Sequence, residues 1–205
     1  MNMTKAISLG FTNQTFPAGV HICQIYSSEE ERKDSLEKFL LSGLVTGERT
    51  ACFSEKFDED SLNSLLIEHG LSCCQAKESG AFSAAGTNDV YFQNGIFDPD
   101  RMLGMLRQYH LDSVANGYPA ARVIGEMTAD VLTVPGGERL LEYEARVSML
   151  LKEHPVTAVC QYDANSFDGA TLMQILKAHP LMVIRGTVVH NPFYISPEEL
   201  LNSAN

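Results

Sequence analysis

Two acidic residues stand at the ends of apolar segments, where carboxylates often do chemistry. Glu126 lies near the end of the apolar run that begins at Ala121, and Asp163 follows the run that begins at Val156. In nucleotide hydrolases, acids at such positions hold magnesium or activate water. The same carboxylates could bind a small polar ligand, accept hydrogen bonds from loop amides or cap the next helix. The residues alone leave these roles open.

The first strand-to-helix junction lacks the residues that hold a phosphate. A phosphate loop of the form G-x-x-x-x-G-K-[ST] supplies backbone amides, a lysine and a magnesium-binding hydroxyl, and the sequence contains no such segment. After the apolar segment 20–26 the chain reads Ser27-Ser28-Glu29-Glu30-Glu31. Three carboxylates in a first helical turn suit the helix dipole and repel a phosphate. We therefore expect no ATP chemistry here.

Histidine and cysteine side chains are a second source of chemistry. His21 and Cys23 are two residues apart, so on a strand they face the same side, and with Cys160 or His179 they could ligate a metal. A buried cysteine more often acts as a small apolar residue, however. We expect no metal, no cofactor and no catalytic residue. Five cysteines occur without CxxC or other metal-ligand spacing: Cys23, Cys52, Cys73, Cys74 and Cys160.

Alternating strand and helix patterns must position these residues. Ser28 and Glu31 have the spacing of a capping box, which starts a helix that Gly47 ends. Residues 79–88 read as a flexible loop, followed by a short strand near 90–92. Arg185-Gly186-Thr187 predicts the turn of an antiparallel hairpin over 181–190. The other predicted strands are 20–26, 49–54, 121–127 and 156–162, and the other helices are 58–69, 98–116, 137–153 and 169–178.

The β-α-β-α order predicts a parallel sheet covered by helices, with ligands in the crevice beyond the carboxyl ends of the strands. The predicted rim of this crevice consists of the strand ends 26–27, 54–55, 126–127 and 162–163. Tyr143 and Glu144 lie on adjacent faces of a helix, so we expect only one of them to point inward. We divide the chain into a lead-in, 1–18, and a single domain, 19–205.

Composition excludes several classes of function. The 205 residues are 44% hydrophobic and 20% charged, which is enough for one full core. With 26 acidic and 15 basic residues, the net charge of −11 repels nucleic acid and anionic membranes. The sequence shows neither a secretory leader nor an apolar run of the ~18 residues that a membrane span needs. We expect a cytoplasmic protein that binds neither nucleic acid nor membrane directly.

A set of weak motifs becomes specific through its order and spacing. Together they resemble the MEDS family, the methanogen and methylotroph sensory domain first recognised in a dichloromethane-dehalogenase regulator, over roughly residues 17–195. The motifs are His21-x-Cys23-x-x-Tyr26, Gly43-Leu44-x-x-Gly47-Glu48-Arg49, Arg122-x-x-Gly125-Glu126-Met127, Tyr143-Glu144, Cys160-x-Tyr162-Asp163, His179-Pro180 and Asn191-Pro192-Phe193-Tyr194.

The resemblance implies a RecA-like or KaiC-like α/β sandwich of three layers that has lost its phosphate loop and serves in signalling, through sensing of hydrocarbon derivatives. The family's domain often accompanies a histidine kinase or a DNA-binding helix-turn-helix, and neither is recognisable in these residues. Ala129 stands where many relatives are expected to carry tryptophan, and the chain has no tryptophan. The implied pocket therefore differs from theirs in shape and ligand.

We expect a non-enzymatic sensory domain that binds a small molecule or a partner protein and relays this to a histidine kinase or a transcription regulator. One alternative is a nucleotide- or metal-dependent enzyme that uses Glu126 and Asp163. Another is a structural subunit that forms a homo-oligomer. The predicted ligand-binding residues are Tyr26, Glu126, Met127, Tyr143, Glu144, Tyr162, Asp163, His179, Asn191 and Tyr194.

Overall fold

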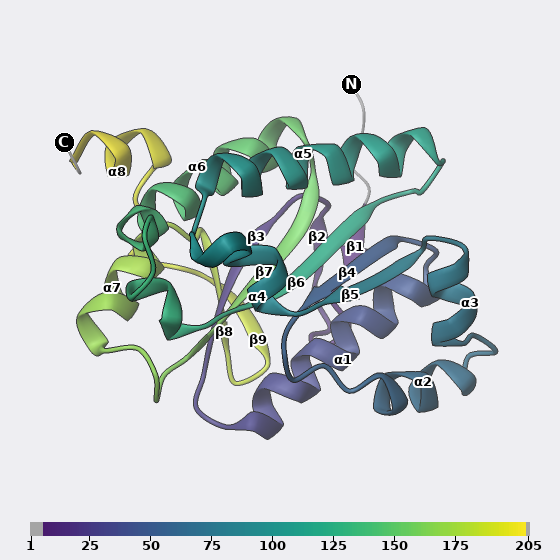
Figure 1. Ribbon diagram of the computed structural model, residues 1–205. Coiled ribbons are helices and arrows are strands. Elements are labelled where there is room, and N and C mark those ends of the chain that lie inside the picture. The colour runs from purple at the N-terminus through teal and green to yellow at the C-terminus, as the bar shows by residue number, and fades with distance from the viewer. Residues whose placement is uncertain (1–5, 204–205) are drawn as a thin grey trace.

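A computed structural model describes residues 6–203, in which strands and helices alternate along most of the chain (Figure 1). Within this part, seven strands form one sheet in the order β5-β4-β6-β7-β3-β8-β9. Strands β3 to β8 run parallel to their neighbours, and only β9 runs antiparallel, to β8. The strands are β3 (His21–Tyr26), β4 (Arg49–Phe53), β5 (Phe82–Ala85), β6 (Ala121–Met127), β7 (Val156–Asp163), β8 (Leu181–Ile184) and β9 (Thr187–His190).

Helices cover both faces of the sheet, which gives three layers (Figure 1). Helices α1, α2 and α3 lie against one face, and α5 and α6 against the other. This confirms the predicted RecA-like sandwich with its antiparallel hairpin. The helices are α1 (Glu29–Val45), α2 (Glu59–Ile67), α3 (Cys73–Glu78), α4 (Thr87–Tyr91), α5 (Pro99–Ala115), α6 (Leu140–Glu153), α7 (Gly169–Lys177) and α8 (Pro197–Ser203), with short 3-10 turns at 93–95, 129–132 and 137–139.

Side-chain alternation divides each strand between two hydrophobic cores. In β3, Ile22 packs into the core beneath α1, whereas Cys23 packs into the core beneath α5 and α6. In β7, Val159 belongs to the α1 side and Tyr162 to the α6 side. The sheet therefore sorts polar side chains onto two separate faces by the same rule.

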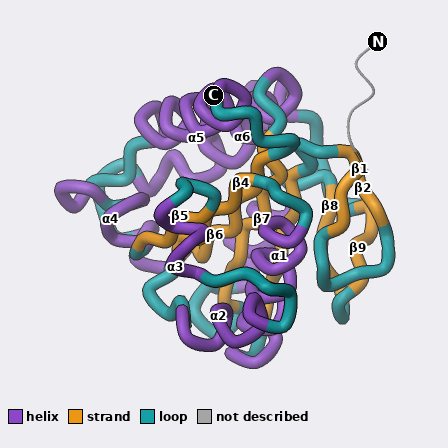
Figure 2. The backbone as a smooth tube through the Cα atoms, turned by 90° about the vertical axis from the view of Figure 1, so that its right-hand side faces the viewer, coloured by secondary structure: helices purple, strands orange, loops and turns teal. Residues whose placement is uncertain are grey.

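Two hairpins lie side by side at one edge of the molecule (Figure 2). Strands β1 (Ala6–Ser8) and β2 (Thr15–Pro17) form a separate antiparallel pair from within the predicted lead-in. Ile7 and Leu9 are buried in the core beneath α1, so this hairpin packs onto the domain. In the second hairpin, β8 and β9 are joined by Arg185 and Gly186, both with positive φ, as a tight two-residue turn requires.

The region before α5 differs from its prediction. The strand expected near 90–92 is wrong, because Val90 and Tyr91 lie in α4. A strand forms earlier, at β5, within residues predicted to be a flexible loop. It forms there because β4 supplies its hydrogen-bond partners and the core buries Phe82. Helix α4 begins where a distant carboxylate caps it: Glu55 accepts hydrogen bonds from Asn88 N at 2.9 Å and from the Thr87 hydroxyl at 3.1 Å.

No helix in residues 6–203 is long and apolar enough to cross a membrane.

Candidate functional site

The predicted crevice exists at the carboxyl ends of the parallel strands, as a small cavity of about 210 Å³. Five of the residues expected at its rim line it: Tyr26, Glu55, Glu126, Met127 and Asp163. Lys56 also lines the cavity, from the loop after β4. A crevice is therefore present at the predicted end of the sheet. Whether it can bind a ligand depends on whether its polar groups are already paired within the protein.

Glu126 is already surrounded by donors. Tyr26 Oη donates a hydrogen bond to one carboxylate oxygen at 2.7 Å, and Ser54 Oγ donates to the other at 2.7 Å. Arg32 Nη1 and Lys56 Nζ lie 3.9 and 3.6 Å from the same carboxylate. Burial and the bond to Glu126 raise the pKa of Tyr26, so its hydroxyl stays a donor. The carboxylate of Glu126 is thus already paired within the protein, at the wall of the crevice.

The start of α1 completes this network. Only Ser27 and Ser28 separate β3 from α1, which is too short for a glycine-rich phosphate loop. Ser28 Oγ accepts a hydrogen bond from Glu31 N at 3.2 Å, so the predicted cap is confirmed. Behind the cap, the buried Arg32 guanidinium forms a close ion pair with Glu29. The positive charge of Arg32 is therefore already paired with a carboxylate of the same helix.

Asp163 accepts hydrogen bonds from the loop that follows β7. Its carboxylate accepts hydrogen bonds from Asn165 N at 2.8 Å and from Ser166 Oγ at 3.0 Å. Burial acts to raise its pKa, but these hydrogen bonds outweigh it and hold the pKa of Asp163 below its usual value. Both strand-end acids are therefore engaged by neighbouring protein groups.

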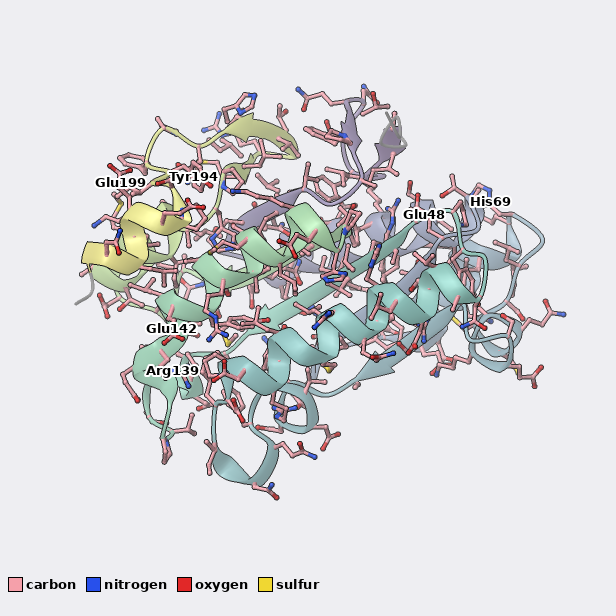
Figure 3. The ribbon with its side chains drawn as sticks, turned by 90° about the horizontal axis from the view of Figure 1, so that it is seen from above. Glu48, His69, Arg139, Glu142, Tyr194 and Glu199 are labelled. Carbon is pink, nitrogen blue, oxygen red and sulfur yellow. The ribbon has the colours of Figure 1, made fainter. Side chains whose placement is uncertain are left out.

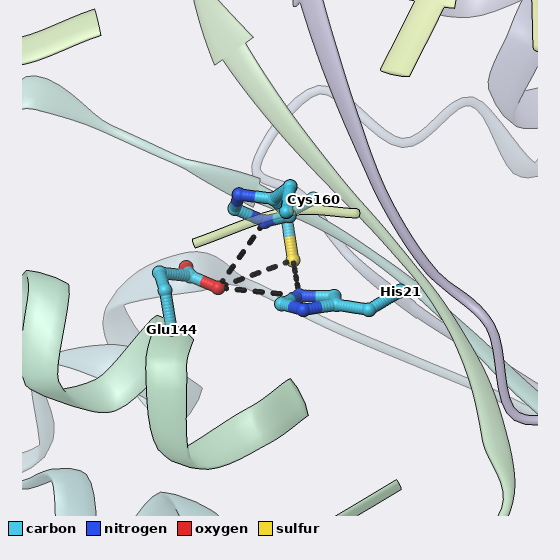
Figure 4. A group of neighbouring side chains, drawn as sticks. His21, Glu144 and Cys160 are labelled. Carbon is cyan, nitrogen blue, oxygen red and sulfur yellow. Dashed lines mark hydrogen bonds and ion pairs between the residues drawn. The ribbon is translucent and has the colours of Figure 1, made fainter. Parts of the chain in front are cut away.

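A second polar cluster lies on the opposite face of the sheet, beneath α6. We call His21, Glu144, Cys160 and His179 the histidine cluster. Glu144 Oε2 lies 3.3 Å from His21 Nε2 and 3.4 Å from His179 Nε2, and Cys160 Sγ lies 3.4 Å from His21 Nε2. Figure 4 shows Glu144 reaching from its helix toward His21 and Cys160. Two of the predicted site residues, Glu144 and His179, thus meet here, far from Glu126.

The histidine cluster is almost fully enclosed. His21, Glu144 and His179 are at most 2% exposed. Burial, together with the nearby His179 ring, lowers the pKa of His21 to about 4, so this ring is neutral at neutral pH. Burial and the adjacent Glu144 carboxylate raise the pKa of Cys160 well above its usual value. Cys23, which we had paired with His21 as a candidate ligand, is not part of the cluster.

Two other predicted residues, Tyr143 and Asn191, contact neighbouring protein groups rather than a cavity. The expectation that only one of Tyr143 and Glu144 points inward is wrong: both are buried, because α6 is covered by the sheet on one side and by neighbouring helices on others. Tyr143 packs edge-on against Phe97. Asn191 Nδ2 donates to Leu176 O and His179 O at 2.6 and 2.8 Å, and so ties the end of α7 to the hairpin.

A cavity larger than the crevice lies at the other end of β3. We call it the hairpin pocket, because it lies between β2 and the β8–β9 hairpin, next to α6. Its volume is about 600 Å³. Along β3 it is separated from the crevice by five residue steps, or about 17 Å. Its walls include Phe16, Val20, Leu181, His21, Ser148 and Tyr194.

Sequence reasoning missed most of this pocket. Of the predicted site residues only Tyr194 lines it, on the side of the molecule near α8 (Figure 3). The turn motifs around Pro180 and Pro192 were the one available signal. They did not show that Phe16, from a strand far away in the sequence, completes the wall. The hairpin pocket and the histidine cluster share His21, which lines the pocket and reaches Glu144 behind it.

Comparison with known proteins now places the chain. The model of the methanogen/methylotroph, DcmR sensory domain family matches residues 20–180. The chain belongs to the MEDS family. The matched residues of this MEDS domain include the crevice and the whole histidine cluster, and they end where the β8–β9 hairpin begins. No curated protein matches the chain.

Solved structures similar to this MEDS domain share its architecture. A KaiC-like protein of Pyrococcus horikoshii OT3 aligns with a TM-score of 0.58 at 14% identity, covering 87% of this chain and 79% of its own. The flagellar accessory protein FlaH of Methanocaldococcus jannaschii aligns with a TM-score of 0.58 at 11% identity, covering 89% and 83%. At these identities the likeness shows the fold alone.

Proposed function

We propose that this MEDS domain is a non-enzymatic sensory module that binds a small, largely apolar organic molecule in the hairpin pocket. The observation that carries the proposal is the size and lining of that pocket. Its volume of about 600 Å³ falls in the range of small-molecule sites, and such sites are mostly apolar with a few convergent polar groups. The family match supports a sensory role. The acidic residues at the crevice already have hydrogen-bond partners within the protein, which favours the hairpin pocket as the ligand site.

The lining predicts the chemistry of the ligand. Phe16, Val20 and Leu181 offer apolar surface to a hydrocarbon body. Ser148 Oγ lies beside His21 at the inner wall, and because its own proton goes to Ala178 O it could accept a hydrogen bond from a polar substituent such as a hydroxyl. A short-chain alcohol or another hydrocarbon derivative with one polar end fits this description better than a phosphate or a nucleotide.

The same walls provide a route for the signal. The hairpin pocket is bounded by β2, the start of β3, α6 and the β8–β9 hairpin, so a ligand contacts several elements at once. A ligand that binds one arrangement of the hairpins better than another shifts the population toward it. We propose that a histidine kinase or a transcription regulator reads this shift from the outer surface of the hairpins.

Calorimetry and thermal shift with a panel of short-chain alcohols, halogenated alkanes and methylated compounds test the proposal. We expect at least one compound to raise the melting temperature in a saturable way. Val20→Trp, which fills the half-buried pocket wall, should remove that shift. Val114→Trp is the matched control, because Val114 is 61% exposed on α5 and does not line the pocket.

Two outcomes contradict the proposal. One is the absence of a saturable shift with every compound in the panel. The other is a shift that survives Val20→Trp but disappears when crevice residue Glu126 is changed to glutamine, since that would move the ligand to the strand ends.

A further inference from the structure

Four electron-rich side chains converge beneath α6 from four separate parts of the fold. His21 begins β3, Glu144 lies on α6, Cys160 lies on β7 and His179 precedes β8. Each offers one ligand atom, and these four atoms all lie within 4.8 Å of one another. The chain brings them together across 158 sequence positions, from His21 to His179, so local structure alone does not account for the cluster.

The spacing of the four atoms matches a tetrahedral metal site. With bonds of about 2.0 to 2.3 Å from zinc to nitrogen, oxygen and sulfur, the edges of a tetrahedron measure about 3.3 to 3.6 Å. The distances from Glu144 Oε2 to His21 Nε2, His179 Nε2 and Cys160 Sγ are 3.3, 3.4 and 3.7 Å. The distance from His21 Nε2 to Cys160 Sγ is 3.4 Å. The remaining two distances, from His179 Nε2 to His21 Nε2 and to Cys160 Sγ, are at most 4.8 Å, so a single ion could bind all four atoms if the His179 ring moved inward by about 1 Å.

Both imidazoles are held in the tautomer that a metal requires. His179 Nδ1 lies 2.8 Å from Ile175 O, which can only accept, so Nδ1 carries the proton. His21 Nδ1 lies 2.8 Å from Ser148 Oγ, whose own proton goes to Ala178 O at 3.0 Å, so His21 Nδ1 is also the donor. Each Nε2 therefore turns a lone pair toward the cluster, and such outer hydrogen bonds are how proteins fix metal-binding histidines.

A metal ion would satisfy the lone pairs that face one another here. His179 Nε2 is fully buried and has no hydrogen-bond partner among the residues that the structure describes. Its nearest polar neighbour is Glu144 Oε2, which is itself an acceptor when ionised. The other oxygen, Oε1, accepts a hydrogen bond from Tyr162 Oη. Glu144 is thus arranged to give one oxygen to a metal while Tyr162 holds the second.

From this geometry we propose that the histidine cluster is a closed four-ligand site for a divalent transition-metal ion, with Zn²⁺ as the best match. Two imidazoles, one thiolate and one carboxylate suit this borderline-soft ion, and four protein ligands leave no open position for catalysis. The ion would join α6 to β3, β7 and the segment before β8. It would also fix His21, and through it the inner wall of the hairpin pocket.

Metal binding can be measured on the full chain without any organic ligand, so this proposal does not depend on the sensory one. After removal of any affinity tag and dialysis against a chelator, we titrate Zn²⁺ in competition with a chromophoric chelator and record the absorption spectrum with Co²⁺. We expect one tightly bound ion per chain. The Co²⁺ form should show the strong visible bands of tetrahedral coordination and a thiolate-to-cobalt charge-transfer band in the near ultraviolet.

Two matched cysteine variants locate the site. Cys160→Ser removes a proposed ligand and should weaken Zn²⁺ binding at least about tenfold, with loss of the charge-transfer band. Cys23→Ser changes a buried thiol directly opposite Cys160 on the neighbouring strand, and should leave both unchanged. Circular dichroism establishes that each variant is folded, and the wild-type Co²⁺ spectrum tests the proposal even if a variant is not.

The proposal is overturned if wild-type protein binds no more Zn²⁺ than Cys160→Ser does, or if the Co²⁺ spectrum lacks the thiolate band. His110 and His154 form a less buried histidine pair, with their Nδ1 atoms 3.3 Å apart, that could bind metal adventitiously. Loss of the tightly bound ion in His110→Gln, with retention in Cys160→Ser, would assign the metal to that pair and overturn the proposal equally.

Discussion

At the scale of single residues, Arg122 and Glu48 form a deeply buried ion pair on the α1 face of the sheet. Arg122 on β6 is fully buried: its Nε donates a hydrogen bond of 2.8 Å to Glu48 Oε2, and its Nη2 lies 2.8 Å from the same oxygen as an ion pair. Its third contact is with Phe39 O in α1. Burial acts to lower the pKa of Arg122, and Glu48 opposes this. A buried pair of this kind is costly to break because the remaining charge is left without a partner.

We predict that Glu48→Gln lowers the free energy of unfolding by about 3–5 kcal/mol, since it leaves the buried guanidinium uncompensated. Urea denaturation followed by circular dichroism measures the change. Glu59→Gln is the control, because Glu59 pairs with Lys77 on the surface and such pairs contribute about 0–1 kcal/mol. Equal effects in the two variants would contradict the prediction.

At the scale of elements, α1 lies unusually close to the sheet where it crosses Arg122. A Cβ on Gly43 would lie 2.6 Å from Arg122 Cδ and 2.7 Å from Thr50 Oγ1. Glycine is therefore required here for close approach, although it weakens a helix by its backbone freedom. Gly104, within α5, has no atom within 4 Å of an added Cβ and has no such constraint.

Alanine at these two glycines should have opposite effects. Gly43→Ala should destabilise the fold by about 1–3 kcal/mol, because the methyl group forces α1 or Arg122 to move. Gly104→Ala should stabilise it by about 0.5–1 kcal/mol, which is the ordinary gain at an open helical position. Thermal or chemical unfolding of both variants measures this contrast, and a stabilising Gly43→Ala would show that α1 is not held close to the sheet.

At the scale of the whole molecule, the two ends of the parallel strands differ in character. The carboxyl ends, where α/β sheets usually bind ligands, hold a small crevice crossed by the bonds of Glu126 to Tyr26 and Ser54. The opposite end holds the larger hairpin pocket, which exists because two hairpins meet beside α6. The larger cavity of this mostly parallel sheet thus lies away from the carboxyl ends of its strands.

We therefore predict that ATP with Mg²⁺ gives no saturable heat of binding in calorimetry. The junction between β3 and α1 has no room for a phosphate loop, and the carboxylates of Glu29, Glu30 and Glu31 repel the nucleotide. Micromolar binding of ATP that Glu126→Gln abolishes would contradict this and would favour the alternative of an enzyme at the strand ends.

Much of the fold followed from local patterns. The helix cap at Ser28 and the apolar strands are set by neighbouring residues, and their boundaries were predicted within a few positions. The secondary-structure prediction was wrong where contacts with residues distant in the sequence determine the structure. Phe82 lies in a strand because β4 pairs with it, and α4 begins where Glu55 caps it from another loop. Neither partner is visible within a short window of sequence.

The sequence by itself determined the α/β class, the loss of the phosphate loop and the resemblance to the MEDS family, because all three rest on local periodicity or on motifs in order. It also named polar residues that line the crevice or belong to the histidine cluster, among them Glu126, Glu144 and His179. Only the tertiary structure decided which of them meet. Alternation along the strands sends Glu126 to the α1 face and Tyr162 to the α6 face, and β3–β7 pairing brings His21 to Cys160. Contacts of that range depend on how whole elements pack, and a pattern along the chain does not encode them directly.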